Sequence, residues 1–125
     1  MEKTAVHTDQ APAAIGPYSQ GIAVNNMLFL SGQLGIDPAT GKMPESVTEQ
    51  TELSLKSISA ILAERGMTLD NVVRTTVLLA DINDFAAVNE VYGKAFSEPY
   101  PVRCAYEVAN LPAGGLVEIE VLATA

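Results

Sequence analysis

Two helix-like segments alternate with strand-like runs along this chain, and this order restricts the fold more than any other feature. Segment 46–66 has apolar residues at helical intervals, capping-box spacing between Ser46 and Glu49, and a stop signal at its end, Gly66. Segment 85–96 has a second helical pattern. Strand-like runs cover 19–24, 27–33, 71–80 and the stretches that begin at Pro101 and Val117. The predicted element order is ββαβαββ.

Each predicted helix has one apolar side, which must be buried. A single face of one sheet can cover both helices, and 125 residues suffice for one domain with its own core. We therefore expect one α+β domain over 1–125, a β-sheet with two helices on one face and a second face that needs another cover. Residues 1–18 lack periodicity and contain Pro12, Gly16 and Pro17, which predicts an extended arm or loop.

The charge of the chain disfavours nucleic acid as a partner. Fifteen acidic residues against seven basic ones give a net charge of -8, and the basic residues are scattered along the chain. Such a surface repels a phosphate backbone, and the aromatic content of 6%, without Trp, leaves little surface for stacking bases. A small anionic ligand remains compatible with this charge, because a buried arginine sets the potential in its own vicinity.

The single cysteine and the single histidine limit the chemistry further. With only Cys104 the chain cannot form an intrachain disulfide, and with only His7 it lacks the ligands for a zinc site. There is no phosphate-binding loop, dinucleotide fingerprint or Ser-His-Asp set. No segment has the apolar length of a signal peptide or a membrane span. We expect a soluble cytoplasmic protein without membrane contact, metal or cofactor.

The C-terminal stretch PVRCAYEVANLPAGGLVEIEV is typical of two strands around a turn. Because side chains alternate along a strand, an antiparallel pairing would place Arg103, Glu118 and Glu120 on one common face. One interpretation is a surface ion pair, worth about 0–1 kcal/mol. The other is an anion clamp beside a proton-transferring carboxylate, on a half-apolar face that a second copy of the chain covers and desolvates. That face also holds three apolar residues, namely Ala105, Leu116 and Leu122.

Other candidates for a site each have a purely structural alternative. Asn89 shares a predicted helical stripe with Phe85, so its amide belongs either to the core or to a pocket. Tyr18 is either a partly buried loop residue or a pocket residue. Ser31 and Gly32 lie at a predicted strand end, which is either a simple strand exit or a place where backbone groups meet a ligand.

Cys104 is a weak candidate for a nucleophile. Strand alternation points its side chain away from that of Arg103, and no histidine is near to act as its base. We therefore expect Cys104 to be a core residue.

Several segments resemble those of one known family, in the same order and over nearly the whole chain. They are IGPYSQ, LSGQ, EQT at the start of the first helix, NVVRTTVLLADINDFAAVNEVY and PVRCAYEVANLPAGGLVEIEV. The most specific is Pro-x-Arg followed, fifteen residues after the arginine, by the glutamate of Val-Glu-Ile. The chain thus resembles the RidA (YjgF-like) family of reactive imine deaminases.

This resemblance implies a chorismate-mutase-like α+β fold, assembled as a homotrimer with ligand pockets between subunits. It implies that Arg103 clamps the substrate carboxylate and that Glu118 positions or activates water, a choice that strand alternation alone leaves open between Glu118 and Glu120. The substrate-binding positions that it implies, besides Arg103, are Tyr18, Ser31, Gly32, Phe85 and Asn89.

The implied activity is hydrolysis of reactive 2-imino or enamine acids, such as 2-iminobutanoate and 2-iminopropanoate, to 2-oxo acids and ammonia. These imines arise when pyridoxal-phosphate dehydratases act on threonine or serine, so the implied role is metabolite damage control in amino-acid metabolism. Alternatives are a non-catalytic oligomeric binder of small 2-oxo carboxylates with a regulatory role, and a deaminase of a larger substrate such as 2-aminomuconate. The short segment 97–102 and Ala105 depart from some members and leave the pocket rim open to variation.

Overall fold

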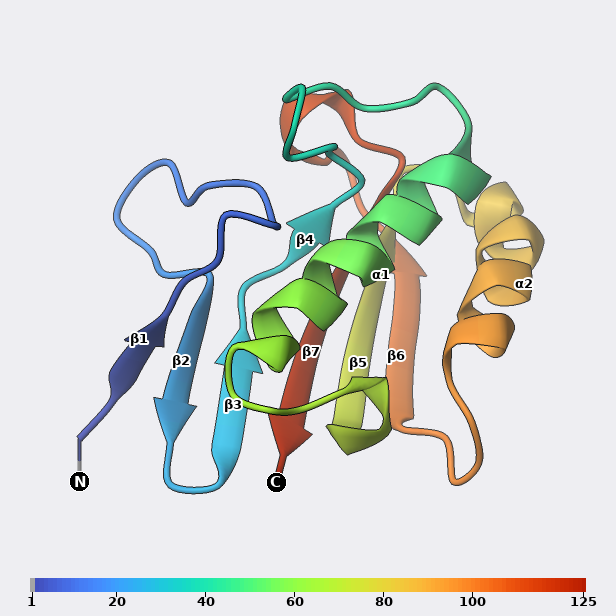
Figure 1. Cartoon of the computed structure of the whole chain (residues 1–125). Helices are drawn as coiled ribbons and strands as arrows, with labels where there is room; N and C mark the ends of the chain where they lie inside the picture. Colours follow the sequence, from blue (N-terminus) through green and yellow to red (C-terminus); the bar gives the residue numbers. More distant parts are fainter. Residues whose placement is uncertain (1) are drawn as a thin grey trace.

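Seven strands form one mixed sheet within residues 2–125, which are the residues that the computed structural model describes. Two helices lie on the same side of this sheet (Figure 1). The helices are α1 (Val47–Ala63) and α2 (Phe85–Ala95). The strands are β1 (Thr4–Val6), β2 (Gly21–Val24), β3 (Met27–Leu30), β4 (Gln33–Leu34), β5 (Val72–Leu79), β6 (Val102–Glu107) and β7 (Val117–Thr124).

The strand order across the sheet is β1-β2-β3-β7-β5-β6, with β4 paired to β7 beyond the end of β3. The pair β5 and β6 is parallel and is joined through α2, whereas the other pairs are antiparallel. β2 and β3 are joined by the two-residue turn Asn25-Asn26, in which Asn25 has a φ of 54°. β6 therefore forms one edge of the sheet, and α2 lies beside that edge (Figure 1).

Helix α1 begins as its sequence pattern predicts. The Ser46 hydroxyl accepts a hydrogen bond from the Glu49 backbone N–H at 3.1 Å, which satisfies one of the free donors of the first turn. Its apolar stripe is buried against the sheet, and each fully buried leucine or isoleucine stabilises the fold by about 1.5–3 kcal/mol. The buried apolar residues of α1 are Leu55, Ile58, Ile61 and Leu62.

The core lies between the helices and one face of the sheet. Val117, Ile119 and Val121 of β7 point into it and are almost fully buried, as strand alternation predicts. The opposite face, called the open face below, has no helix over it. It carries exposed apolar side chains at Met27, Phe29, Val102 and Tyr106.

Three local predictions are wrong. Residues 1–18 are not only an arm or loop, because residues 4–6 form β1. β6 and β7 do not form a hairpin, because β5 lies between them and pairs with both. Cys104 is exposed rather than part of the core, and Ala105 on the other side of β6 packs against the core instead.

The parallel crossover through α2 explains why β6 and β7 do not form a hairpin. Since β6 runs parallel to β5, the chain must reverse before β7, and β7 then pairs with the free edge of β5 on its other side. Among residues 2–125, no helix has the length and apolar character needed to cross a membrane.

Candidate functional site

Arg103 of β6 is held by side chains of α2. One of its terminal nitrogens, Nη1, donates a hydrogen bond to Asn89 Oδ1 at 2.6 Å. Its Cζ atom lies 5.1 Å from the centroid of the Phe85 ring and 4.8 Å from that of the Tyr92 ring. These are cation–π distances, so the two rings form an apolar shelf on which the guanidinium rests. These contacts bring Phe85, Asn89 and Arg103, three of the predicted pocket residues, together.

Tyr92 completes this shelf. Its ring is buried and its hydroxyl is 2.8 Å from the Thr75 hydroxyl. Thr75 is also the neighbour of Arg103 in the β5–β6 register. The Tyr92–Thr75 hydrogen bond therefore fixes the ring beneath the arginine. Tyr92 is not among the predicted pocket residues, although its position three residues after Asn89 on the same helical stripe was a usable signal.

The guanidinium of Arg103 keeps free hydrogen-bonding capacity. An arginine has five N–H donors, of which the structure commits one to Asn89. No carboxylate of residues 2–125 forms an ion pair with it. A hollow of about 290 Å³ lies beside it and is lined by Asn89, Tyr92, Gly93, Tyr100, Pro101 and Arg103. The interpretation of Arg103 as half of an intrachain surface ion pair is therefore wrong.

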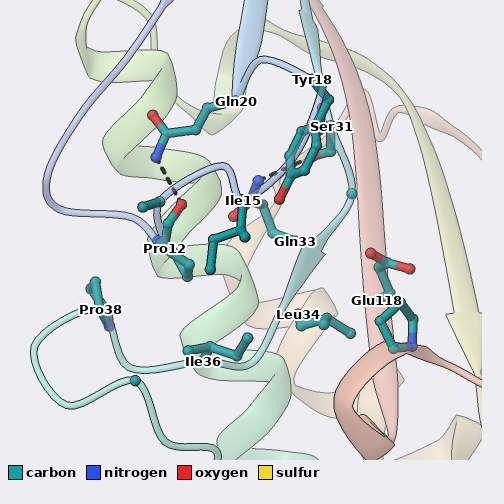
Figure 2. Close-up of a pocket in the computed structure, with 14 residues that line it drawn as sticks. Pro12, Ile15, Tyr18, Gln20, Ser31, Gln33, Leu34, Ile36, Pro38 and Glu118 are labelled. Carbon is teal, nitrogen blue, oxygen red and sulfur yellow. Dashed lines mark hydrogen bonds between the residues drawn. The ribbon is translucent and has the colours of Figure 1, made fainter.

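A second, larger hollow of about 690 Å³ contains the Glu118 carboxylate. Tyr18, Ser31 and Gly32 line this hollow together with Glu118, so these four predicted residues are brought together. Figure 2 shows Pro12, Ile15 and Tyr18, from the loop between β1 and β2, facing this hollow, with Glu118 of β7 on its other side. Its further lining residues are Ala13, Gln20, Gln33, Leu34, Ile36, Pro38, Gly41 and Pro112.

Burial raises the pKa of the half-buried Glu118 carboxyl, and the nearby negative charge of Glu120 raises it further. Desolvation disfavours the charged form, and a like charge on the same face of the strand acts in the same direction. Such a carboxyl exchanges a proton nearer to neutral pH than an ordinary surface glutamate does. This property suits a group that must take up and return a proton.

Gly32 leaves open the space that the Glu118 carboxylate occupies. A Cβ atom on Gly32 would lie 2.8 Å from Glu118 Oε2 and 2.9 Å from Glu118 Cδ, which is closer than side-chain atoms normally approach. The carboxylate therefore rests directly on the backbone at this position. The absence of a side chain, rather than any conformational freedom of glycine, is what the site requires here.

Ser31 holds the end of the loop between β1 and β2 through two hydrogen bonds. Its hydroxyl donates a hydrogen bond of 2.6 Å to the Ser19 carbonyl, and its backbone N–H donates one of 2.9 Å to the Gln20 carbonyl. The hydroxyl proton of Ser31 is thus already used within the chain, although the oxygen can still accept a hydrogen bond from a ligand.

The two hollows lie on opposite faces of the sheet. In the β5–β6 and β5–β7 registers, Thr75 is paired with Arg103 and Leu78 is paired with Glu118. Paired residues point to the same face, and residues three apart in a strand point to opposite faces. Arg103 therefore points to the helix side and Glu118 to the open face. The prediction that Arg103, Glu118 and Glu120 share one face is wrong, because β5 separates β6 from β7 and the predicted side of β6 is inverted.

One copy of the chain therefore carries two candidate sites that the sheet keeps apart. One is a cation with free donors, and the other is a half-buried carboxylate in a largely apolar hollow. Among residues 2–125, no group of three or more His, Cys, Asp or Glu side chains is arranged to hold a metal ion.

Comparison with known proteins identifies the family. The family model described as Endoribonuclease L-PSP matches residues 8–125. A protein of Capra hircus named 2-iminobutanoate/2-iminopropanoate deaminase is 53% identical, over 94% of this chain and 87% of its own length. A protein of Arabidopsis thaliana named Reactive Intermediate Deaminase A, chloroplastic, is 51% identical, over 99% of this chain and 67% of its own length. The chain belongs to the RidA family.

Solved structures of RidA family members and related chains have the same fold. RidA from the Antarctic bacterium Psychrobacter sp. superposes with a TM-score of 0.95 at 46% identity, covering 98% of this chain and 99% of that one. TdcF of E. coli, solved with bound serine, superposes with a TM-score of 0.93 at 41% identity, with 98% of both chains covered. The predicted YjgF-like α+β fold with two helices on one face of the sheet is confirmed.

Proposed function

We propose that the protein is a 2-iminobutanoate/2-iminopropanoate deaminase, which hydrolyses 2-imino acids to 2-oxo acids and ammonia. The observation that carries this proposal is the pair of complementary half-sites: an arginine with free donors on an aromatic shelf, and a half-buried carboxylate with a raised pKa. Relatives that are about half identical to this chain over most of its length bear the name of this activity.

Arg103 is the group that binds the substrate carboxylate. A guanidinium fork binds a carboxylate through two parallel N–H···O bonds, which fix both the position and the plane of the acid. The hydrogen bond from Nη1 to Asn89 Oδ1 and the shelf of Phe85 and Tyr92 hold the fork in one orientation. Asn89 and Phe85 are therefore supporting residues of the clamp.

Glu118 is the group that moves protons. It takes a proton from water as the water oxygen bonds to the imine carbon, and it then returns this proton to the nitrogen of the carbinolamine. The C–N bond breaks, the hydroxyl proton also passes to nitrogen, and the products are the 2-oxo acid and ammonium. General acid–base help of this kind contributes about 10²–10⁴-fold. The carbon of the protonated imine is already electrophilic, so Arg103 and Glu118 suffice for its hydrolysis.

The complete site forms from two copies of the chain. Since the sheet separates Arg103 from Glu118 within one copy, a substrate that contacts both must lie between Arg103 of one copy and Glu118 of another. Arg103 lies on the edge strand β6, where a neighbour can approach it. Glu118 lies on the open face, whose exposed apolar side chains favour burial against the copy that supplies Arg103. A closed homotrimer with three such pockets satisfies both requirements.

An assay with a competing imine trap tests the activity. Threonine dehydratase supplies 2-iminobutanoate, semicarbazide competes for it, and the release of 2-oxobutanoate is followed over time. The protein is expected to raise the initial rate of 2-oxobutanoate release above that of spontaneous hydrolysis. No increase at a concentration that binds 2-oxobutanoate would favour a non-catalytic binder of 2-oxo acids.

Gly32→Ala is expected to lower kcat/KM at least about tenfold, because misplacement of a catalytic group by about 1 Å can cost up to about 10²-fold. The added methyl group would displace the Glu118 carboxylate, whose flexible end can move away. The free energy of unfolding, measured in urea, is therefore expected to fall by about 1 kcal/mol, the low end of the usual cost of an added methyl group in a packed site. An unchanged kcat/KM would show that the carboxylate does not need this position.

Glu120→Gln is expected to move the acid limb of the kcat/KM profile to lower pH. The negative charge of Glu120 raises the pKa of Glu118, and its removal lets Glu118 ionise at lower pH. The matched control is Glu64→Gln, which removes the same charge from an exposed residue after α1. An acid limb that moves equally in both variants, or that moves to higher pH in Glu120→Gln, would contradict the assignment of this limb to Glu118.

A further inference from the structure

The side chain of Gln20 is buried where the loop between β1 and β2 rejoins the sheet. It is only 2% exposed. Its Oε1 accepts a hydrogen bond of 2.7 Å from the Thr8 N–H, and its Nε2 lies within donating distance of three carbonyl oxygens. These belong to Thr8 at 3.1 Å, Ala11 at 3.4 Å and Pro12 at 2.9 Å. One amide thus binds the backbone of the same loop at several points.

This loop forms one wall of the hollow that contains Glu118. Pro12, Ile15 and Tyr18 all come from it, and Figure 2 shows the Gln20 amide bound to the Pro12 carbonyl behind that wall. Ile15 is 87% exposed and Tyr18 is 52% exposed, so packing holds their side chains only weakly. Apart from the contact of the buried Ala11 with the core, the position of the wall therefore depends on hydrogen bonds between the loop and the body of the protein.

The hydrogen bonds that anchor the loop are few. Gln20 binds its first half, and Ser31 binds its end through the carbonyls of Ser19 and Gln20. The β1–β2 pairing holds the chain before the loop through Val6 and Gly21. Loss of the Gln20 amide is therefore expected to release the loop between residues 8 and 19 without separating the strands.

We propose that Gln20 is a positioning residue that sets ligand affinity by fixing the Pro12–Tyr18 wall, an inference that rests on the proposed function for the identity of the ligand. Gln20 does not contact the reacting atoms. It acts through the loop, so its replacement changes how tightly the site holds a ligand more than it changes the catalytic step. A residue that served folding alone would alter the fraction of active protein and leave affinity unchanged.

Gln20→Glu provides a switchable test because the two side chains have the same shape. A neutral carboxyl can still accept from the Thr8 N–H and donate its single O–H to a carbonyl, whereas the ionised form would face three carbonyl oxygens without a donor. The dissociation constant for 2-oxobutanoate is measured by calorimetry from pH 5 to pH 8, in both the variant and the parent. The ratio of the two constants is expected to be near one at the acid end and about tenfold at the alkaline end.

Gln20→Met is the matched variant without a titrating group. Its dissociation constant is expected to be raised by a similar factor at every pH. The exposed His7–Asp9 pair lies on the same loop, with a 3.0 Å contact between its side chains. Because parent and variants share this pair and Glu118, dividing the dissociation constant by that of the parent removes any pH effect that does not come from residue 20.

Hydrogen exchange gives a readout that does not depend on activity or ligand. Backbone amides between residues 9 and 19 are expected to exchange faster in Gln20→Met at all pH values and in Gln20→Glu only at the alkaline end, with exchange in α1 unchanged. Faster exchange with an unchanged dissociation constant would overturn the proposal, as would unchanged exchange. If Gln20→Met fails to fold, Gln20→Glu at pH 5 is its own control. A parent that binds 2-oxobutanoate but does not hydrolyse imines would contradict the proposed function alone.

Discussion

Arg103→Ala is expected to lower kcat/KM for 2-iminobutanoate by about 10²–10³-fold, which corresponds to about 3–4 kcal/mol of lost transition-state binding. The variant loses the only group of its half-site that can neutralise the substrate carboxylate. It also leaves the Asn89 amide oxygen without the donor that it contacts at 2.6 Å. The measurement is the initial rate of 2-oxobutanoate release with semicarbazide as the competing trap.

Two controls separate the clamp from general effects of charge. Arg65→Ala removes an exposed arginine after the end of α1, and its rate is expected to match that of the parent. Arg103→Lys keeps the positive charge but lacks the planar fork, so a rate between those of the parent and the alanine variant is expected. If Arg103→Ala hydrolyses the imine like the parent while its oligomer is intact, Arg103 does not bind the substrate.

Glu118→Gln is expected to lower kcat by about 10²–10⁴-fold, the usual range for loss of a general acid–base group. An amide fills nearly the same space above Gly32 but cannot accept a proton from water. Binding of 2-oxobutanoate is expected to weaken much less, because Arg103 still holds the carboxylate. Steady-state kinetics give kcat, and calorimetry gives the dissociation constant for 2-oxobutanoate.

The comparison variant for Glu118→Gln is Glu120→Gln, which lies two residues further along the same face of β7. Its kcat at neutral pH is expected to fall far less, and the reverse ranking would reassign the catalytic role. The loss in Glu118→Gln is not expected to come from unfolding. The raised pKa of Glu118 means that its ionisation opposes folding as the pH rises above the ordinary glutamate range, so a neutral amide is not expected to lower stability at pH 7 on this account.

Local patterns in the sequence predicted both helices, most of the strands and the buried sides of α1 and β7. The Ser46 cap, the stripe of α1 and the buried side of β7 follow from hydrogen-bond and packing rules that act over a few residues. Helical spacing also predicted that Phe85 and Asn89 lie one turn apart on one stripe of α2, where both contact Arg103, but it left open whether they belong to the core or to a pocket. The role of Glu118, in contrast, was distinguished from that of Glu120 only by resemblance to a family.

Strand neighbours could not be predicted in the same way. Alternation assigns residues to two sides of a strand, but it does not say which strand lies beside it or which side faces the helices. The C-terminal stretch therefore looked like a hairpin, whereas β7 pairs with β5 and Arg103 points away from Glu118. Gln20 was missed because its partners are backbone groups up to twelve residues away in an irregular loop.

Arg103 of one copy and Glu118 of another are proposed to act on the same substrate. The most direct measurement mixes the two inactive variants, Arg103→Ala and Glu118→Gln, by unfolding equal amounts together and refolding them. In a closed ring with random assembly, about one quarter of the pockets receive both native residues. The mixture is therefore expected to recover about one quarter of the parent activity, whereas a mixture of Arg103→Ala with the double variant recovers none. A mixture of the two single variants that stays as inactive as its components would contradict a site shared between copies.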